Sequence, residues 1–475
     1  MIMNKKILLI IAAILMVAIA GATTTHFLFP YEPTQPPDVK DVNITENDTE
    51  NDNITKHGGE EGNITENDIE DGNITKHDVE DVNITENDVE DAELANNMFG
   101  FDMLNKLLEE KDEENGNEDE NIFYSPYSIF SALAMTYEGA RGQTAEEMES
   151  VFYFPEKEKL RSGFAYIYNQ INDEDRNYEL RTGNALWIQE DYELLDEYMQ
   201  TIEDYYGGKS TNLDFANQNE ESRQTINTFI EEQTNDRIKN LIRKGQLPKD
   251  TKLVLTNAIY FKDNWKWEFD KENTRNRSFW VTPDESVEAE MMRMNPEDER
   301  FNYTETEKLQ MIELPYEGGD VSMFIILPKD EIDDISHKLN NEDVEELMDE
   351  MRERELSSIS IPKFKFETRY VMSGTDSTLA RMGMPKAFTP IADFSGITGE
   401  RELFIDSVIH QAFVEVDETG TEAAAATAVI MVPESYVPGR KSPPRFIADN
   451  PFVFFIRDNE TGTNLFTGIV KDPTK

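Results

Sequence analysis

The chain has 475 residues and is strongly acidic, with 97 Asp and Glu against 45 Lys and Arg and a formal net charge of −52 at pH 7. This balance argues against DNA, RNA or heparin-like polyanions as partners, because such ligands require clustered basic side chains. The absence of cysteine from the sequence excludes disulfides, thiol catalysis and thiolate metal sites.

The N-terminus carries an export signal. Lys5 and Lys6 precede an apolar run over residues 7–20, and Ala18-Ile19-Ala20 has the small-x-small form of a signal-peptidase site. Continued to Phe29, the apolar segment is also long enough to cross a bilayer with tilt. We therefore expect residues 1–22 to be a cleaved signal peptide or a membrane anchor. In both cases the protein is extracellular, either secreted or tethered to the cell surface.

Residues 23–92 form an acidic, low-complexity segment in which a proline-rich spacer precedes a decapeptide repeat. The repeat has no aromatic residue and few aliphatic ones, so it cannot bury a core and is predicted to be a disordered stalk. Each copy begins with Asn-Ile-Thr, which is a glycosylation acceptor, and one Asn-Asp-Thr adds another. The acceptor asparagines are Asn43, Asn47, Asn53, Asn63, Asn73 and Asn83. The stalk is either glycosylated or an unmodified acidic filler.

Helical patterns come first and strand patterns later in residues 93–475. The first helix is expected over residues 92–110, with Leu94, Met98, Phe101, Leu104 and Leu107 on one face. Further helices are predicted over residues 143–152, 160–171, 194–206, 221–242 and 341–352. Strands are predicted over residues 253–261, 321–327, 357–366 and 452–456. This order favours an α+β fold over a regularly alternating one.

No catalytic motif emerges from the sequence. It contains no HExxH, no GxSxG and no glycine-rich dinucleotide fingerprint. Only five histidines occur, and three of them lie in the leader and stalk. Carboxylate pairs are abundant merely because the chain is acidic, so a secreted hydrolase has only these generic residues in its favour. We expect neither a metal nor a cofactor.

The segment from Glu415 to Val429 reads EVDETGTEAAAATAV. Residues this small cannot supply a core, and Gly420 makes the segment a mediocre helix. Read with period two, one face carries Thr421, Ala423, Ala425 and Thr427, while Glu422 lies on the other. Such a strand could enter a crowded sheet, with Gly420 giving the backbone freedom to hinge. The alternative is a flexible surface loop.

The flanking sequence decides between these alternatives. In chain order it contains NIFYSPYSIFSALAM (121–135), LRTGNALW (180–187), LVLTNAIYFKDNWKWEF (253–269), LPYEGGDVSMFIILP (314–328), IPKFKF (361–366), ADFSGI (392–397) and NPFVFF (450–455). With the alanine-rich segment, these blocks make residues 93–475 resemble the inhibitory serpins, in an exported, prokaryotic-like form. The resemblance implies a serpin-like α+β fold with three β-sheets, eight or nine helices and an exposed reactive-centre loop.

The resemblance also implies roles for particular residues. The hinge of the loop would consist of Glu418, Gly420, Thr421, Ala423, Ala424, Ala425, Ala426 and Thr427. The shutter, a polar cluster beneath the main sheet, would consist of Ser125, Ser128, Asn257 and His410. Trp265 would lie at the breach, which is the upper opening of that sheet. By itself His410 would simply be a core histidine satisfied by hydrogen bonds.

Inhibitory serpins are suicide substrates, so the resemblance implies a monomeric protease inhibitor rather than an enzyme. Cleavage of the loop would let its N-terminal part insert into the sheet, trapping a serine (perhaps a cysteine) protease as an acyl-enzyme. In such relatives the hinge glutamate precedes the scissile residue by sixteen positions, which predicts the bond Glu434-Ser435. Tyr436 and the bond Arg440-Lys441 are alternatives, and using Arg440 would lengthen the inserted segment by roughly 20 Å. The competing function is a non-inhibitory serpin acting as an extracellular binding or chaperone module.

Overall fold

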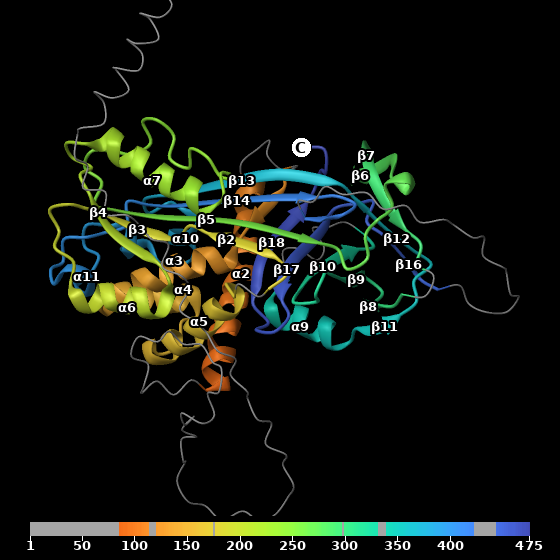
Figure 1. The fold of residues 1–475 in the computed structure, drawn as a ribbon, viewed down its shortest axis with the longest axis horizontal. Helices are drawn as coiled ribbons and strands as arrows, with labels where there is room; N and C mark the ends of the chain where they lie inside the picture. The colour runs from red at the N-terminus through yellow and green to blue at the C-terminus, as the bar shows by residue number, and fades with distance from the viewer. Residues whose placement is uncertain (1–84, 114–119, 174–175, 297–298, 331–338, 422–442) are drawn as a thin grey trace, which may run out of the picture.

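The computed structural model describes residues 85–113, 120–173, 176–296, 299–330, 339–421 and 443–475. Within these ranges three β-sheets and nine α-helices form an α+β fold, which confirms the predicted class (Figure 1). The predicted leader and nearly all of the predicted stalk lie outside the described residues. In the described part of the chain, no helix is long and apolar enough to cross a membrane.

Most of the helices lie in the first half of the described chain, where only short strands separate them. Their bounds are α2 Glu86–Glu113, α3 Pro126–Gly139, α4 Gly142–Phe152, α5 Lys157–Ile171, α6 Asp196–Tyr206, α7 Asn219–Gln233, α9 Asn341–Asp349, α10 Thr378–Met382 and α11 Ser395–Thr398. Two short 3-10 helices cover Lys271–Asn273 and Pro385–Phe388. Helix α2 begins at Glu86, inside the segment that the sequence assigns to the stalk.

The strands form a large sheet, a C-terminal sheet and a small sheet. The large sheet has the order β13-β14-β15-β5-β3-β4, with β2 beside β5. Its strands are β2 Glu179–Thr182, β3 Ala185–Gln189, β4 Lys209–Leu213, β5 Leu253–Asn264, β13 Phe364–Met372, β14 Ser407–Val416 and β15 Gly420–Thr421.

The C-terminal sheet has the order β1-β18-β17-β10-β9-β8-β11 and the small sheet the order β16-β12-β7-β6. The C-terminal sheet consists of β1 Ile122–Tyr124, β8 Phe301–Glu305, β9 Leu309–Pro315, β10 Val321–Pro328, β11 Arg352–Arg354, β17 Phe452–Asp458 and β18 Asn464–Val470. The small sheet consists of β6 Arg275–Thr282, β7 Glu285–Met294, β12 Ser358–Pro362 and β16 Arg445–Ile447.

The middle of the large sheet is buried on both faces, and the side chains of β3 and β5 alternate between two apolar clusters. On the inner face, Leu186 and Leu255 belong to the main core. On the outer face, Trp187 and Val254 pack in a second cluster with Ile226 of α7, and Figure 1 shows α7 lying along this sheet. Any strand added within the sheet would therefore pass beneath α7.

Helix α3 brings the chain under the inner face of the large sheet. Ser125 is its N-cap, accepting a hydrogen bond from the amide of Ser128 over 3.0 Å, and Pro126 occupies the first turn, where its missing N–H costs nothing. Every residue of α3 is buried. This rigid, capped start fixes Ser125 and Ser128 beneath β14 and β5.

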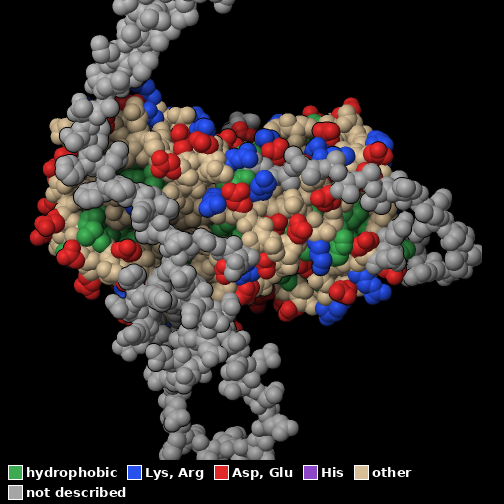
Figure 2. Space-filling view, viewed as in Figure 1, with side chains coloured by type: hydrophobic (Ala, Val, Ile, Leu, Met, Phe, Trp, Pro, Cys, Tyr) green, Lys and Arg blue, Asp and Glu red, His purple; other side chains and the backbone are tan. Residues whose placement is uncertain are grey.

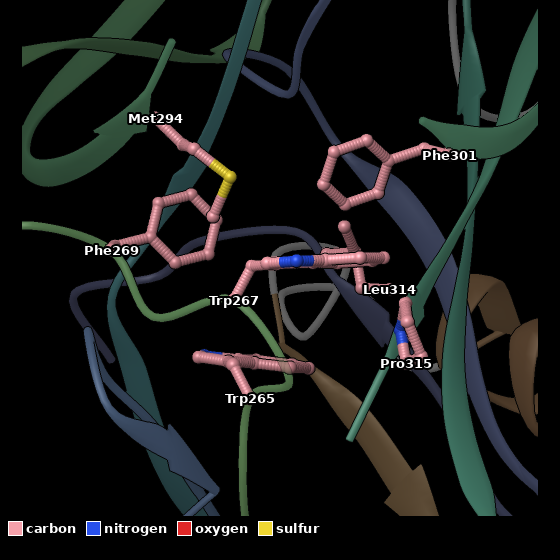
Figure 3. A pocket seen from close by; sticks show the side chains of 7 residues that line it. All are labelled: Trp265, Trp267, Phe269, Met294, Phe301, Leu314 and Pro315. Atoms are coloured by element: carbon pink, nitrogen blue, oxygen red, sulfur yellow. The ribbon is translucent and has the colours of Figure 1, made fainter. Parts of the chain in front are cut away.

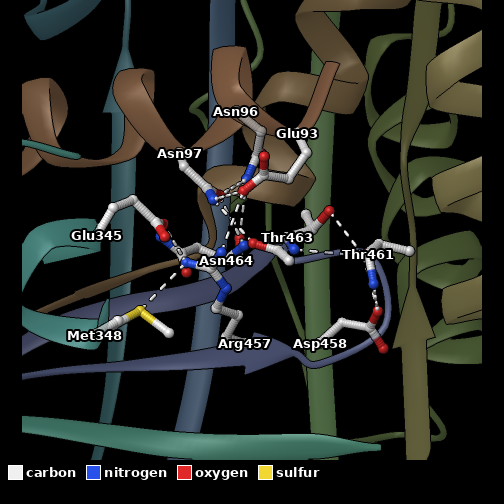
Figure 4. A network of polar contacts seen from close by, with 11 residues as sticks. Glu93, Asn96, Asn97, Glu345, Met348, Arg457, Asp458, Thr461, Thr463 and Asn464 are labelled. Carbon is white, nitrogen blue, oxygen red and sulfur yellow. Dashed lines mark hydrogen bonds and ion pairs between the residues drawn. The ribbon is translucent and has the colours of Figure 1, made fainter. Parts of the chain in front are cut away.

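The N-terminal half of α2 is held by polar contacts to the turn between β17 and β18 (Figure 4). Asn97 accepts a hydrogen bond from the amide of Asn464 over 2.8 Å, and Arg457 pairs with Glu93 of α2 and Glu345 of α9. This arrangement corrects the predicted helical face. Leu94 is 45 % exposed, whereas Phe101, Leu104 and Leu107 are buried as expected.

Two predicted elements differ from the structure. The helix expected over residues 221–242 ends at Gln233, because Asn235 and Asp236 adopt the left-handed conformation with φ of 50° and 62°. The single strand expected over residues 357–366 is two strands, β12 and β13, which belong to different sheets. The chain crosses between these sheets at Lys363.

Side chains of both signs are interspersed on the surface of the protein. On the face shown in Figure 2, acidic side chains are scattered widely and basic ones stand singly or in small groups among them. The expectation that polyanions are not partners stays a prediction.

Candidate functional site

The candidate site begins where β14 turns back into β15. The side chain of Asp417 holds this turn, since its Oδ1 accepts hydrogen bonds from the amide and hydroxyl of Thr419 over 2.8 and 2.6 Å. The amide of Asp417 in turn donates to the carbonyl of Gly420 over 3.0 Å. The result is a tight Asp-centred turn that sends the chain antiparallel to β14.

Strand β15 is wedged between β14 and β5 at one end of the large sheet. Thr421 lies opposite Val416 of β14 and opposite Asp263 of β5, and both pairings are antiparallel. Beyond this point β14 and β5 pair directly and in parallel, from Ser407 opposite Val254 to Ala412 opposite Ile259. The sheet is therefore parted by the two residues of β15 at one end and closed where residues 407–412 pair with residues 254–259.

Aromatic residues seat the first residues of β15. Thr421 is only 1 % exposed, and its hydroxyl lies 2.7 Å from that of Tyr316. The ring of Tyr316 stacks on Trp265 with 4.5 Å between centroids. Trp265 also donates from Nε1 to the carbonyl of Asp417 over 2.9 Å. Trp265, which the sequence assigned to the breach, thus contacts the turn that leads into β15.

Glu418 is anchored by two partners on the small-sheet side. Its carboxylate accepts a hydrogen bond from the hydroxyl of Thr274 over 2.7 Å and pairs with Lys363 Nζ at 3.1 Å. Burial opposes ionisation of this carboxyl, but these hydrogen bonds and the Lys363 charge outweigh it and lower the pKa of Glu418. The hinge glutamate is therefore a fixed anion rather than a solvated one.

Gly420 is packed closely against the backbone of β5, and its predicted hinge freedom stays a prediction. A Cβ at this position would lie 2.1 Å from the carbonyl oxygen of Asp263 and 2.6 Å from the Cα of Asn264. These are backbone atoms that cannot give way as a side chain could. Glycine is needed here because β15 approaches β5 closely, not because the backbone is left-handed.

The predicted shutter residues lie together beneath the closed part of the large sheet. His410 of β14 lies directly opposite Asn257 of β5, and its Nδ1 contacts the Asn257 Oδ1. Its Nε2 accepts a hydrogen bond from the amide of Ser125 over 3.0 Å. An accepting Nε2 requires the neutral ring with its proton on Nδ1. Burial agrees with this assignment, since it lowers the pKa of His410 to about 3.

The serines extend this network into the C-terminal sheet. Ser125 Oγ donates to the carbonyl of Leu465 in β18 over 2.6 Å, and Ser128 Oγ donates to Asn184 Oδ1 over 2.9 Å. The Nδ2 of Asn257 has no hydrogen-bond partner among the described residues. The network therefore joins β14, β5, α3 and β18 while leaving one buried donor unsatisfied at the β14–β5 seam.

The space beside Trp265 is filled by side chains (Figure 3). Its lining consists of Trp265, Trp267, Phe269, Met294, Phe301, Leu314 and Pro315, around a cavity of about 10 Å³. A cavity of this size holds at most one water. The aromatic cluster thus supports the hinge mechanically and is not a ligand site.

The remaining predicted site residues lie outside the described residues. They are Ala423, Ala424, Ala425, Ala426, Thr427, Glu434, Ser435, Arg440 and Lys441, and likewise the six acceptor asparagines of the stalk. In the described part of the chain no group of three or more His, Asp or Glu side chains could hold a metal ion.

Sequence reasoning missed several residues that build the site, among them Tyr316, Asp263, Lys363 and Thr274. Each is distant in sequence from the hinge, and each meets it only through strand pairing or the crossing between sheets. Tyr316, Asp263 and Lys363 stood within blocks quoted for the serpin resemblance, which was the only available signal. Nothing in their local spacing indicates a contact with Thr421.

Comparison with known proteins assigns the chain to a family. A family model described as "Serpin (serine protease inhibitor)" matches residues 94–473. The chain therefore belongs to the serpin family.

Three relatives illustrate the range of the family. An uncharacterized serpin-like protein from Methanosarcina acetivorans is 44 % identical over 80 % of this chain and 87 % of its own length. The human leukocyte elastase inhibitor is 37 % identical over 80 % of this chain and 98 % of its own. Human thyroxine-binding globulin, solved with its hormone, is 26 % identical with a TM-score of 0.70, covering 82 % of this chain and all of that one.

Proposed function

We propose that this serpin is an extracellular suicide inhibitor of proteases. Serine proteases are the first candidates for its target and cysteine proteases the second. The observation that carries the proposal is the seating of β15, whose two residues already occupy the space between β14 and β5. Once the loop is cleaved, its N-terminal part would continue this strand, separating β14 from β5 and pairing with both.

The observed register tells which residues of the loop would meet which residues of the sheet. Continued from Thr421, the antiparallel pairing would bring Ala423 between Val414 and Phe261, both of which are buried on the inner face. Alanine suits this position because a larger side chain would overfill a packed core. Glu422 would face outward beside Lys262, where a charge is tolerated.

The same register would bring Thr427 between His410 and Asn257. These two residues now contact each other directly, so insertion would have to separate them. A threonine hydroxyl can both donate and accept, which would let it replace the lost contact. The orphan Nδ2 of Asn257 would be available to that hydroxyl. The contact between His410 and Asn257 would then keep β14 and β5 together until the inserting loop replaces it.

The length of the sheet favours Glu434-Ser435 as the reactive bond. The last pairing partners for the inserted strand would be Ser407 and Val254, which lie opposite Ile430 in the extrapolated register. Glu434 would follow four residues later, roughly 13 Å of extended chain, whereas Arg440 would overrun the sheet by roughly 33 Å. The longer overrun leaves slack, so a protease cutting at Arg440 would finish hydrolysis and depart.

The proposal includes the setting of the inhibitor. It acts as a monomer outside the cell, secreted or tethered through the N-terminal segment, with the acidic stalk as a spacer that carries glycans on its Asn-Ile-Thr repeats. The leukocyte elastase inhibitor among its relatives supports an inhibitory function. Thyroxine-binding globulin supports the alternative, a non-inhibitory binding module. The short side chains of Thr421 and residues 423–427 favour the former, since nothing there obstructs insertion.

The decisive experiment is incubation of the protein with a panel of serine and cysteine proteases, including a glutamyl endopeptidase. An SDS-stable covalent complex, with mass spectrometry placing the acyl bond at Glu434, is the expected result. If every protease that cuts the loop leaves only cleaved product, the binding-module function is correct instead. A catalytically inactive protease variant is the control, because it can dock but cannot acylate.

A further inference from the structure

A buried acidic side chain lies directly beside the seat of β15. Asp263, near the end of β5, is 6 % exposed and lies opposite Thr421 on the inner face of the sheet. Its Oδ1 accepts a hydrogen bond from the amide of Asn264 over 2.7 Å. Its Oδ2 is buried and has no partner among the described residues. A carboxyl in this setting is favoured in its neutral form.

The charges around Asp263 provide no compensation. Glu317 and Asp320, from the turn between β9 and β10, are both acidic and raise its pKa further. Arg176 is committed to Asp320 and Glu460, with the Asp320 contact at 2.9 Å.

The other polar neighbours are also committed. Tyr178, which precedes β2, donates to the carbonyl of Ile171, and the hydroxyl of Tyr316 is paired with Thr421. On the β14 side, Asp417 and Glu418 are bound within the turn and to Lys363. Burial, followed by the two acidic neighbours, accordingly raises the pKa of Asp263 to about 7.

The backbone of the same residue is in contact with the hinge. The carbonyl oxygen of Asp263 lies 2.1 Å from where a Cβ of Gly420 would be, and Thr421 pairs with Asp263, so β15 packs directly on this residue. Opening this end of the sheet would expose the Asp263 carboxyl to water, and closing it buries the group again. The protonation of Asp263 and the seating of β15 are therefore linked.

We propose that Asp263 is a pH-sensitive latch, whose neutral form keeps β15 seated between β14 and β5 and whose ionised form releases it. The latch does not depend on the proposed inhibitory function, because it concerns the hinge of the uncleaved protein. The seated state binds the proton more tightly than the open state. Seating is thus strongest below about pH 4, the ordinary range of an aspartate. It weakens as the pH rises to about 7 and is constant above that value, where both states are ionised.

Hydrogen exchange of the full chain tests the latch. Three amides report on the seat, namely Trp265, Phe269 and Asp417, whose acceptors are the carbonyls of Thr419, Glu418 and Gly420. After correction for the intrinsic pH dependence of exchange, their opening constant should rise up to tenfold per pH unit between about pH 4 and 7, then level off. In Asp263→Asn, which has the same shape but no titrating proton, the opening constant should be flat over this range.

A matched control separates the latch from other titrations. Glu317→Gln should keep the rise but bring the plateau to lower pH, because one like charge near Asp263 is gone. Protonation of His410, farther along the seam between β14 and β5, is linked to stability in an overlapping pH range. Asp263→Asn leaves His410 unchanged, so an effect of His410 would persist in that variant. An opening constant that rises in Asp263→Asn as it does in the parent overturns the proposal, as does a flat profile in the parent. Asp263→Ser provides a second non-titrating variant if the asparagine protein folds poorly.

Discussion

The hydroxyls of Thr421 and Tyr316 lie 2.7 Å apart in a buried setting, where the predicted reactive-centre loop begins at the large sheet. This contact joins the loop to a residue that precedes it by 105 positions, and Tyr316 in turn stacks on Trp265. The hinge is thus already partly built into the sheet before any cleavage. The strength of the contact between Thr421 and Tyr316 should determine how readily the loop inserts further into the large sheet.

Tyr316→Phe should loosen the hinge without disturbing the core. The ring and its stacking are kept, but the buried Thr421 hydroxyl loses its partner, which costs about 1 kcal/mol, or about fivefold in the opening constant. Hydrogen exchange at the amides of Trp265 and Asp417 measures this change. Tyr198→Phe removes another buried hydroxyl, which donates to Met135 far from the hinge. It should lower global stability similarly while leaving hinge exchange unchanged; equal effects in both variants would contradict a local role.

Two neighbouring substitutions test the face and register of insertion. Ala423→Arg would place an unpaired charge between Val414 and Phe261, at a cost of several kcal/mol. The variant should be cut by the target protease at the normal rate while covalent complex falls at least tenfold. Glu422→Arg introduces the same side chain on the outward face and should retain complex formation. If Ala423→Arg still forms undiminished complex on gels, the extrapolated register is wrong.

Cleavage of the loop near Glu434 should make the protein much more stable. About ten loop residues would gain main-chain partners on β14 and β5, and each net hydrogen bond contributes about 1 kcal/mol. The melting temperature should accordingly rise by well over 10 °C, as calorimetry before and after cutting would show. Cutting within the stalk instead is the control and should leave melting unchanged. Unchanged melting after confirmed cleavage at Glu434 would mean that no stored strain exists.

Because His410 is buried in its neutral form, the folded protein should lose stability at low pH. Because burial lowers its pKa to about 3, the unfolded chain takes up a proton between about pH 6.5 and 3 that the folded protein does not. The free energy of unfolding should therefore fall by about 1.4 kcal/mol for each pH unit that the pH is lowered within this window. Above the window His410 should not affect it. Denaturant unfolding from pH 7 to 4 measures the slope. His410→Asn should be less stable at pH 7 and show a shallower slope; an unaltered slope would assign the acid sensitivity to other groups.

The sequence predicted the fold class and several long strands, because apolar runs such as Leu253 to Phe261 leave little choice of structure. The sequence-based prediction was wrong where two strands, β12 and β13, follow each other without a turn signal between them. The apolar positions change phase between Ile361 and Phe364, at Lys363, where the chain changes sheets, and the prediction of one strand ran through that change. Leu94 failed for a related reason, since α2 is covered on several sides and a single apolar stripe does not describe it.

The candidate site was likewise predicted in part from the sequence. Ser125, Asn257 and Trp265 could be assigned because they stand in blocks that resemble a known family, and His410 because the same resemblance covers its position. Their partners could not, because the contacts of Tyr316 and Asp263 arise from the pairing of β15 with β5, which involves only two residues. The close packing of Gly420 against β5 was not predicted either. Close approach of backbones is a property of the packed sheet, whereas the sequence shows only that a glycine is present.

The choice of target protease provides the last prediction. If Glu434 is the bait, the inhibited enzyme should prefer an acidic residue before the cut, as glutamyl endopeptidases do. A trypsin-like enzyme should instead cut after Arg440 and escape, since the inserted segment would be six residues longer, roughly 20 Å. Glu434→Arg should convert the protein into an inhibitor of trypsin-like proteases, and Arg440→Gln in the same chain should increase the yield of complex by removing the competing cut.

Mass spectrometry of the trapped protease distinguishes the two bonds directly. An acyl linkage to residue 434 in both the parent and the Glu434→Arg variant would agree with the limit that the sheet sets on the inserted strand. Arg440→Gln alone serves as the control, because it should leave inhibition of a glutamyl endopeptidase unchanged. A parent complex acylated at Arg440 would show that the sheet accommodates a longer insertion than β14 and β5 can pair. The acidic specificity would then be abandoned in favour of a basic one, while the suicide mechanism itself would stand.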